Sequence, residues 1–147
     1  QDGQNAILDV GQLKYIAFKY SGSAWIELWR SFPFARPISF TPLAPAAADE
    51  MALYIDQASH LVLLKGVRVG GTSVDNVDCK AGTSRASGTS LLANATQDIT
   101  STTTGDVLSL ATTPNIPAGS YVWINIGGVT GTVTSVTFAG VIIDGNL

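Results

Sequence analysis

Residues 13–30 contain two strand-forming runs around a short turn, and this segment constrains the fold more than any other. The first run ends in Ile-Ala-Phe-Lys-Tyr, the second reads Ala-Trp-Ile-Glu-Leu-Trp-Arg, and Ser-Gly-Ser separates them. Such runs around a glycine-containing turn predict a β-hairpin. Large apolar residues fall on both sides of the period-two alternation, so we expect both faces of the hairpin to be apolar. An isolated hairpin is marginally stable in water, so we expect a partner subunit or a larger body to cover this one.

The composition of the chain is poor in charge. Charged residues make up 13% and apolar residues 46% of the 147 residues, whereas soluble domains carry about 25% charged residues. A surface rich in Thr, Ser, Gly, Ala and Asn suits extracellular or virion proteins and subunits covered by their neighbours. The net charge is −3 and the basic residues are scattered. Because phosphate neutralisation needs clustered Lys and Arg, the composition argues against nucleic-acid binding.

Two further features limit the class of protein. No apolar run approaches the ~20 residues that a membrane-spanning helix needs, so we expect no membrane insertion. Cys79 is the one cysteine of the chain, which excludes an internal disulfide and a cysteine-based zinc cluster and favours a buried thiol. The chain starts with Gln1, and we expect it to be a fragment or a processed product.

Prolines mark the segment that follows the hairpin. We expect residues 1–31 to form the hairpin segment and residues 32–50 to form an extended, stiff connector, because proline at this density disfavours helix and central strand. The connector contains Pro33, Pro37, Pro42 and Pro45.

Residues 51–147 show the strand spacing of a single β domain. Short strand-forming runs alternate with Gly, Asn, Asp and Ser, a rhythm typical of an antiparallel sandwich. The predicted fold class is therefore all-β, a β-hairpin followed by an antiparallel, jelly-roll-like sandwich. The predicted strands are residues 51–55, 61–69, 74–79, 90–92, 106–111, 120–126 and 132–143.

The residues available for catalysis are few. His60 is the one histidine, and Glu27 and Glu50 are the two glutamates. No nucleophile-elbow motif accompanies His60, which directly precedes an apolar run and is expected to be a hydrogen-bonded surface residue. We therefore expect a protein that is not an enzyme and that carries no catalytic residues and no cofactor.

One polar cluster is a candidate cation site. Asp75, Asn76 and Asp78 lie close together in the sequence, and such oxygens are ligands that hard cations prefer. Turn formation explains the same residues equally well, so no metal is expected. On a regular strand a spacing of three puts Asp75 and Asp78 on opposite faces, which is a poor arrangement for a hydrolytic pair.

Aromatic residues of the hairpin offer a binding surface. Trp25 and Trp29, with Tyr15 and Tyr20, can either stack on the apolar faces of sugar rings or pack within the core or between subunits. Packing is the favoured interpretation. Trp123, which alternates with Tyr121 and Asn125, is expected to lie in the core.

The hairpin segment resembles a recurring ending of bacteriophage tailspikes and tail fibres. The matching residues are Ile-Leu-Asp-Val-Gly-Gln at 7–12, the strand at 15–20, Gly-Ser-Ala-Trp-Ile-Glu at 22–27, and Arg30. In that family a hairpin of this kind closes a trimeric shaft or β-helix.

The downstream part is similar to small β-sandwich domains of phage tail and capsid-associated proteins. The similarity rests on Gly-Gly-Thr-Ser-Val at 70–74, Ser-Gly-Thr-Ser-Leu-Leu at 87–92 and Thr-Gly-Asp-Val-Leu at 104–108. The resemblance implies a homotrimer at the C-terminal end of a virion tail appendage, exposed outside the cell. It also implies a noncatalytic role in trimerisation and in attachment to host-surface polysaccharide, since the family's depolymerase carboxylates normally lie in a preceding β-helix.

Two other functions stay open. One is a capsid decoration or head-fibre structural protein, and the other is a carbohydrate-binding module of a depolymerase.

We predict that replacing Trp25 or Trp29 by alanine weakens assembly, because the apolar hairpin surface contributes about 25 cal/mol for each Å² that a partner buries. Light scattering coupled to size exclusion measures the mass of the wild type and of each variant. A wild-type trimer that dissociates in the variants agrees with the prediction. Variants that keep both the native oligomer and the native stability contradict it.

Overall fold

The computed structural model describes residues 5–9, 15–20, 25–30, 35–94 and 97–145, with the backbone alone in the first three of these ranges and at Arg85. The chain divides into two compact units, Gln1–Phe34 and Ala35–Leu147.

The first unit contains a three-stranded antiparallel sheet in the order β1-β2-β3. Its strands are β1 (Asn5–Asp9), β2 (Tyr15–Tyr20) and β3 (Trp25–Arg30). The predicted hairpin is confirmed as β2 and β3, and β1 adds a strand that the sequence pattern did not predict. The β2–β3 register shifts between Ala17 and Phe18, so that Tyr20 pairs with Trp25 and Ala17 pairs with Trp29. The prediction that both faces of the hairpin are apolar concerns side chains that lie outside the described part of the chain, so it stays a prediction.

The second unit is built from two antiparallel sheets. One follows the order β10-β6-β14-β4, with β11 also pairing with β6. Its strands are β4 (Ala35–Phe40), β6 (Ser59–Gly70), β10 (Asp106–Val107), β11 (Asn115–Ile116) and β14 (Val133–Asp144). The two long strands β6 and β14 pair over almost their whole length and form the centre of this sheet.

The other sheet follows the order β13-β7-β12-β5, and β8 and β9 also pair with β7. Its strands are β5 (Glu50–Ile55), β7 (Ser73–Gly82), β8 (Thr89–Ser90), β9 (Gln97–Ile99), β12 (Ser120–Asn125) and β13 (Gly128–Thr130). A single 3₁₀ turn, η1 (Arg85–Ser87), follows β7, and the described residues contain no α-helix.

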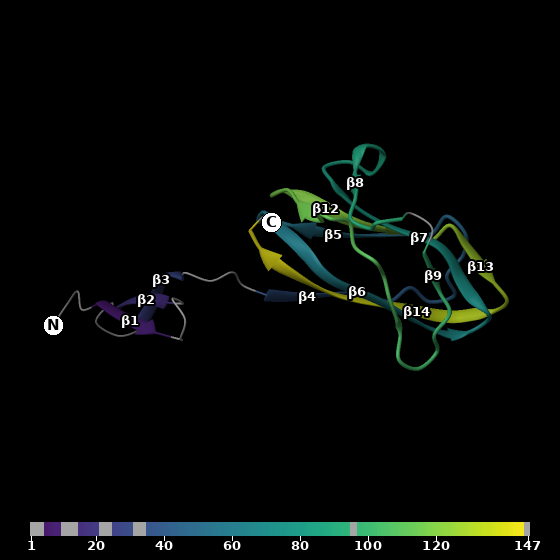
Figure 1. Cartoon of the computed structure of the whole chain (residues 1–147), viewed down its shortest axis with the longest axis horizontal. Coiled ribbons are helices and arrows are strands. Elements are labelled where there is room, and N and C mark those ends of the chain that lie inside the picture. Colours follow the sequence, from purple (N-terminus) through teal and green to yellow (C-terminus); the bar gives the residue numbers. More distant parts are fainter. Residues whose placement is uncertain (1–4, 10–14, 21–24, 31–34, 95–96, 146–147) are drawn as a thin grey trace. The chain divides into compact units, whose positions relative to one another are not determined.

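The two sheets pack face to face, as Figure 1 shows for the layers containing β4, β6 and β14 and β5, β7 and β12. Alternate residues of each strand point into the space between them, so β12 buries every second side chain. The predicted all-β fold with an antiparallel sandwich is therefore confirmed. The largest fully buried side chains include Leu61, Leu64 and Phe138 from one sheet and Val74, Val77, Val122 and Ile124 from the other.

The predicted connector over residues 32–50 does not describe residues 35–40. These residues form β4, whose partner is β14 in a register from Ala35–Ile143 to Phe40–Phe138. Pro37 is compatible with a strand here because β4 is at the end of its sheet, where a residue without an N–H removes no bond from a second neighbour. The sandwich therefore begins at Ala35 rather than at residue 51.

The described residues contain no helix with the length and apolarity to cross a membrane. Cys79, in β7, is completely buried, as expected from its sequence. Burial, and to a lesser extent the neighbouring negative charge of Asp78, raises the pKa of its thiol to about 12.

We predict that Cys79 does not react with a maleimide in the native protein at mildly alkaline pH, because the thiolate is the reactive species and the raised pKa keeps the thiol protonated. Mass spectrometry should find one label only after denaturation. Rapid, complete labelling of the native protein would show that β7 is not buried in this way.

Candidate functional site

A β-bulge in β7 decides which of its side chains face outward. Val74 and Val77 are both fully buried although three positions separate them, and the β7–β9 register shifts between them. Asn76 occupies the left-handed region with φ of 53°, a conformation that Asn tolerates better than most residues. Because this residue interrupts the alternation, Asp75 and Asp78 both lie on the outer face of the sheet. The prediction that they lie on opposite faces is wrong for this reason.

The neighbouring strand β12 alternates regularly. Val122 and Ile124 are fully buried in the core, so Tyr121, Trp123 and Asn125 lie on the outer face. The prediction that Trp123 belongs to the core is therefore wrong.

Strand pairing extends this outer face into three rows across the sheet. The strands β5, β12 and β7 supply one residue each to every row. The rows are Glu50–Asn125–Asp78, Ala52–Trp123–Lys80 and Tyr54–Tyr121–Gly82. Polar residues thus lie at one end of this face and aromatic residues at the other.

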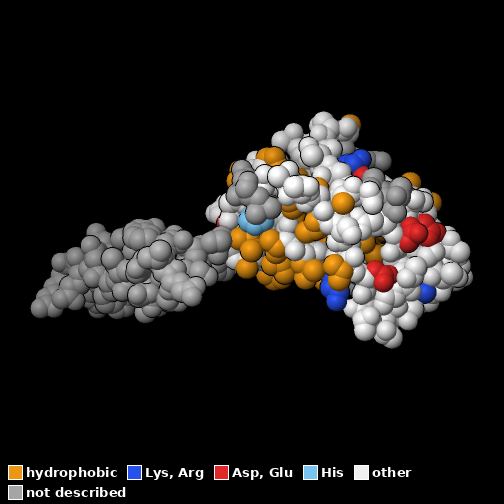
Figure 2. Space-filling model, viewed as in Figure 1, with side chains coloured by type: hydrophobic (Ala, Val, Ile, Leu, Met, Phe, Trp, Pro, Cys, Tyr) orange, Lys and Arg blue, Asp and Glu red, His pale blue; other side chains and the backbone are white. Residues whose placement is uncertain are grey.

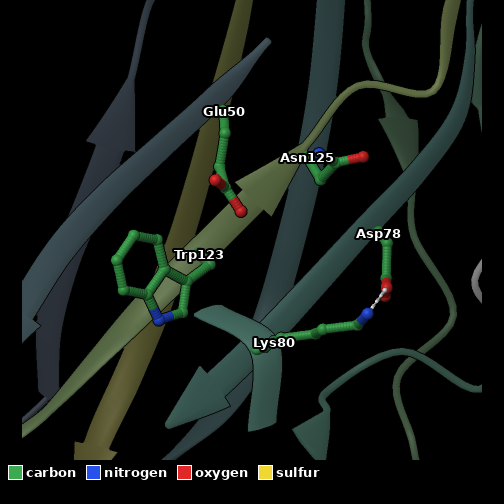
Figure 3. A pocket seen from close by; sticks show the side chains of 6 residues that line it. Glu50, Asp78, Lys80, Trp123 and Asn125 are labelled. Atoms are coloured by element: carbon green, nitrogen blue, oxygen red, sulfur yellow. Dashed lines mark ion pairs between the residues drawn. The ribbon is translucent and has the colours of Figure 1, made fainter. Parts of the chain in front are cut away.

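The polar end forms a pocket of about 370 Å³. Its described lining residues are Glu50, Asp78, Lys80, Ala86, Trp123 and Asn125. In Figure 3, Glu50 and Trp123 lie on one side of the pocket and Asp78 and Lys80 on the other. The sheet supplies all of these residues except Ala86, which comes from the turn η1.

An ion pair holds one wall of this pocket in place. The Lys80 Nζ lies 3.1 Å from Asp78 Oδ2, and the hydroxyl of Ser90 in β8 donates a hydrogen bond to Asp78 Oδ1 at 3.0 Å. The Asp78 side chain is 11% exposed, whereas that of Lys80 is 44% exposed. Because both oxygens of the buried carboxylate have partners, its orientation is fixed.

Three aromatic rings, Tyr54, Tyr121 and Trp123, continue from the pocket along the outer face, and we call them the aromatic strip. The Tyr54 and Tyr121 ring centroids are 5.3 Å apart with an interplanar angle of 63°, and those of Tyr121 and Trp123 are 5.2 Å apart at 41°. Tyr54 is 55% exposed and Tyr121 38% exposed. Large aromatic surface thus faces solvent next to a polar pocket.

Trp123 connects the strip to the pocket and carries a buried polar atom. Its indole Nε1 is inaccessible and has no hydrogen-bond partner among the described residues. A buried donor without an acceptor costs about 1–3 kcal/mol.

This combination of groups suits sugar recognition. Aromatic rings pack against the C–H faces of pyranose rings, while carboxylate and amide groups form hydrogen bonds with sugar hydroxyls. Concave sites with apolar walls and a few convergent polar groups are the usual form of small-ligand sites.

The structure places the other predicted residues elsewhere or does not describe them. Trp25, Trp29, Tyr15 and Tyr20 belong to β2 and β3, and their side chains lie outside the described residues, so their role in glycan stacking or trimer packing stays a prediction.

The predicted cluster of Asp75, Asn76 and Asp78 does not form one site. Asp75 accepts a hydrogen bond from the Thr130 hydroxyl at 2.7 Å, and hydrogen bonds from Ser73 and then Thr130 lower the pKa of Asp75. The backbone N–H of Asn76 donates to Asp98. Asp78 instead belongs to the pocket. Within the described ranges, no group of three or more His, Cys, Asp or Glu side chains could hold a metal ion.

His60, expected at the surface, is buried at the start of β6, with 9% of its area exposed. Its Nδ1 lies 2.7 Å from the backbone oxygen of Gly145, so the expected hydrogen bond is present.

Sequence reasoning missed most of the pocket and of the strip. The signal in β12 was present, because Val122, Ile124 and Ile126 alternate with Tyr121, Trp123 and Asn125. The three aliphatic residues are all apolar, so they predict the side of the strand that faces the core. The side chains that alternate with them, Tyr121, Trp123 and Asn125, are then expected on the outer face. Nothing in the sequence around Glu50 indicated that it faces Asp78 across β12.

Comparisons of the chain with protein-family models, with curated proteins and with solved structures found no match.

Proposed function

We propose that the chain is a noncatalytic attachment module of a bacteriophage tailspike or tail fibre, in which the sandwich binds host-surface polysaccharide. The observation that carries this proposal is the exposed aromatic strip beside a polar pocket on one sheet face. The phage assignment itself rests on the sequence resemblance of the hairpin segment and on the charge-poor composition.

The exposure of the rings supports a binding role for this face. Burial of the Tyr54 and Tyr121 rings would stabilise the folded protein. Both rings nevertheless remain substantially exposed, on a sheet whose other face supplies the core. Aromatic residues gathered in the open mark sites of interaction more often than isolated exposed side chains do. The hydroxyl groups on Tyr54 and Tyr121 suit a hydrated ligand such as a polysaccharide.

In this proposal the first unit has a separate task. The strands β2 and β3 carry the apolar residues that suggest an interface, and we assign trimerisation to them. The sandwich would then present three copies of the aromatic strip, and multivalency raises overall avidity above the affinity of one site.

A second candidate is a capsid decoration or head-fibre protein, and a different surface favours it. The outer side of β6 exposes Val62, Leu63 and Val69, which are 41%, 36% and 57% exposed. Figure 2 shows hydrophobic side chains gathered beside the pale blue histidine on this part of the sandwich. Such a surface suits permanent packing against another virion protein. The aromatic strip would also serve the third candidate, a carbohydrate-binding module of a depolymerase.

We predict that Tyr121→Ala lowers the affinity for a bound polysaccharide about thirtyfold or more, since removal of an aromatic hot-spot residue costs about 2 kcal/mol or more. An array of purified bacterial surface polysaccharides identifies a ligand of the wild type, and calorimetric titration measures each variant.

The matched control is Leu43→Ala, which removes a side chain that is 78% exposed and lies outside the strip. It should bind like the wild type, and circular dichroism should show that both variants are folded. Equal affinity of Tyr121→Ala and the wild type, or no binding of any polysaccharide, would refute the proposed function.

A further inference from the structure

We infer that the outer edge of β5 pairs with β5 of a second copy of the chain, antiparallel and centred on Leu53. β5 is an end strand, since among the described strands only β12 pairs with it. The pairing joins two sheets into one and brings two aromatic strips together. It goes beyond the proposed function, because this edge can pair whether or not the strip binds a polysaccharide.

A hydrogen bond just before β5 shows which of its backbone groups point away from β12. The N–H of Ile126 donates to the carbonyl oxygen of Asp49 at 2.9 Å. In an antiparallel pair, residues that bond to the partner strand alternate with residues whose N–H and C=O groups point to the other side. Counted from Asp49 along the β5–β12 register, Ala52 and Tyr54 belong to the second set. Their backbone groups therefore face the outer edge of the sheet, and both residues are exposed.

β5 lacks the usual protections of an edge strand. Proline, charged side chains and β-bulges commonly keep such strands from pairing with another chain. β5 contains no proline, its register with β12 has no shift, and Glu50 at its first position is its one charged residue. The end strand of the other sheet, β4, contains Arg36 and Pro37. Of these two end strands, β5 is therefore the one open to pairing.

The sequence of β5 suits pairing with itself. A two-fold axis at Leu53 places Ala52 of each copy opposite Tyr54 of the other, so the outward backbone groups of both residues become bonded. The small Ala52 side chain leaves room for the Tyr54 ring. On the inner face, Leu53 lies opposite Leu53 and Met51 opposite Ile55. Apolar cross-strand pairs of this kind stabilise a sheet.

The same register connects the two aromatic strips. Tyr54 lies at the β5 end of the strip, where its ring packs against Tyr121. With Leu53 at the axis, the two Tyr54 residues are diagonal neighbours on the outer face, a spacing that aromatic side chains can bridge. Two copies therefore present one continuous aromatic surface that is longer than either copy supplies alone.

One contact between like charges opposes the pairing. The register brings Glu50 opposite Asp56 of the second copy, and opposed like charges are destabilising. Arg36 lies 3.1 Å from the Asp56 carboxylate, which is 62% exposed. A cation of the same copy and the surrounding solvent thus weaken this repulsion.

The variant Ala52→Pro tests the pairing. Proline is tolerated on an edge strand where the N–H faces away from the sheet, so the variant keeps the bonds of β5 to β12 and loses an N–H that the second copy needs. Light scattering coupled to size exclusion measures the mass of the chain over a range of concentrations. We expect the variant to have half the mass of the wild type or less, since a two-fold contact joins copies in pairs.

The matched control is Ser39→Pro in β4. The N–H of Val136 donates to the carbonyl oxygen of Pro42, and the same alternation along the β4–β14 register directs the Ser39 N–H away from β14. The control thus makes the same change on the other end strand and should keep the wild-type mass. Circular dichroism should show that both variants are folded.

Hydrogen exchange of the wild type gives a second readout. In the paired state the amide groups of Ala52 and Tyr54 are bonded and should exchange slowly, whereas the Ser39 amide should exchange fast. Fast exchange of Ala52 and Tyr54, equal masses of Ala52→Pro and the wild type, or an equal loss of mass in both proline variants would overturn the inference. Absence of polysaccharide binding would refute the proposed function and leave this pairing in place.

Discussion

The inward packing of β7 is the interaction on which the sandwich and its candidate site both depend. Val74, Val77, Cys79 and Ala81 are at most 3% exposed, and β8, β9, β12 and β13 all pair with this strand. Holding both valines in the core requires the bulge at Asn76. That bulge turns the Asp78 side of the strand outward, so the packing that stabilises the fold also builds one wall of the pocket.

The described ion pairs of this charge-poor chain are few, and they lie in two separate parts of the sandwich. Arg36, in the end strand β4, contacts Asp56 at 3.1 Å and Asp144 at 3.0 Å, and a charged side chain and a proline on such a strand are known protections against edge-to-edge pairing. A third described ion pair, Lys80–Asp78, lies in the pocket. The two pairs of Arg36 therefore secure a strand at the end of a sheet, while the Lys80–Asp78 pair holds one wall of the pocket.

The fold class followed from the sequence because it depends on repeated local patterns. The hairpin of residues 15–30 and the strand rhythm of the second unit need only the alternation of apolar and polar residues and the positions of turn formers. The burial of Cys79 also followed, since a lone cysteine behaves as a small apolar residue. The strand β4 was missed because Pro37 argues against a strand unless the strand is known to lie at the end of a sheet.

The site could not be derived in the same way. A single bulge reverses the face assignment of every later residue in a strand, and Asn76 looks like an ordinary turn former in the sequence. The proximity of Glu50 and Asp78 arises only because β12 pairs with β5 and β7 at once, a long-range contact that no local pattern encodes. The prediction that Trp123 lies in the core was wrong because the aliphatic residues that alternate with it, Val122, Ile124 and Ile126, form the core face.

The most direct test of this account uses the three tryptophans as reporters of where a polysaccharide binds. The indole N–H signals of Trp25, Trp29 and Trp123, assigned by single substitutions, are followed by nuclear magnetic resonance during titration with a polysaccharide that the chain binds. We expect the Trp123 signal to shift in proportion to binding while the signals of Trp25 and Trp29 stay in place. Shifts of Trp25 and Trp29 with an unchanged Trp123 would contradict it and would locate the binding surface in the hairpin instead.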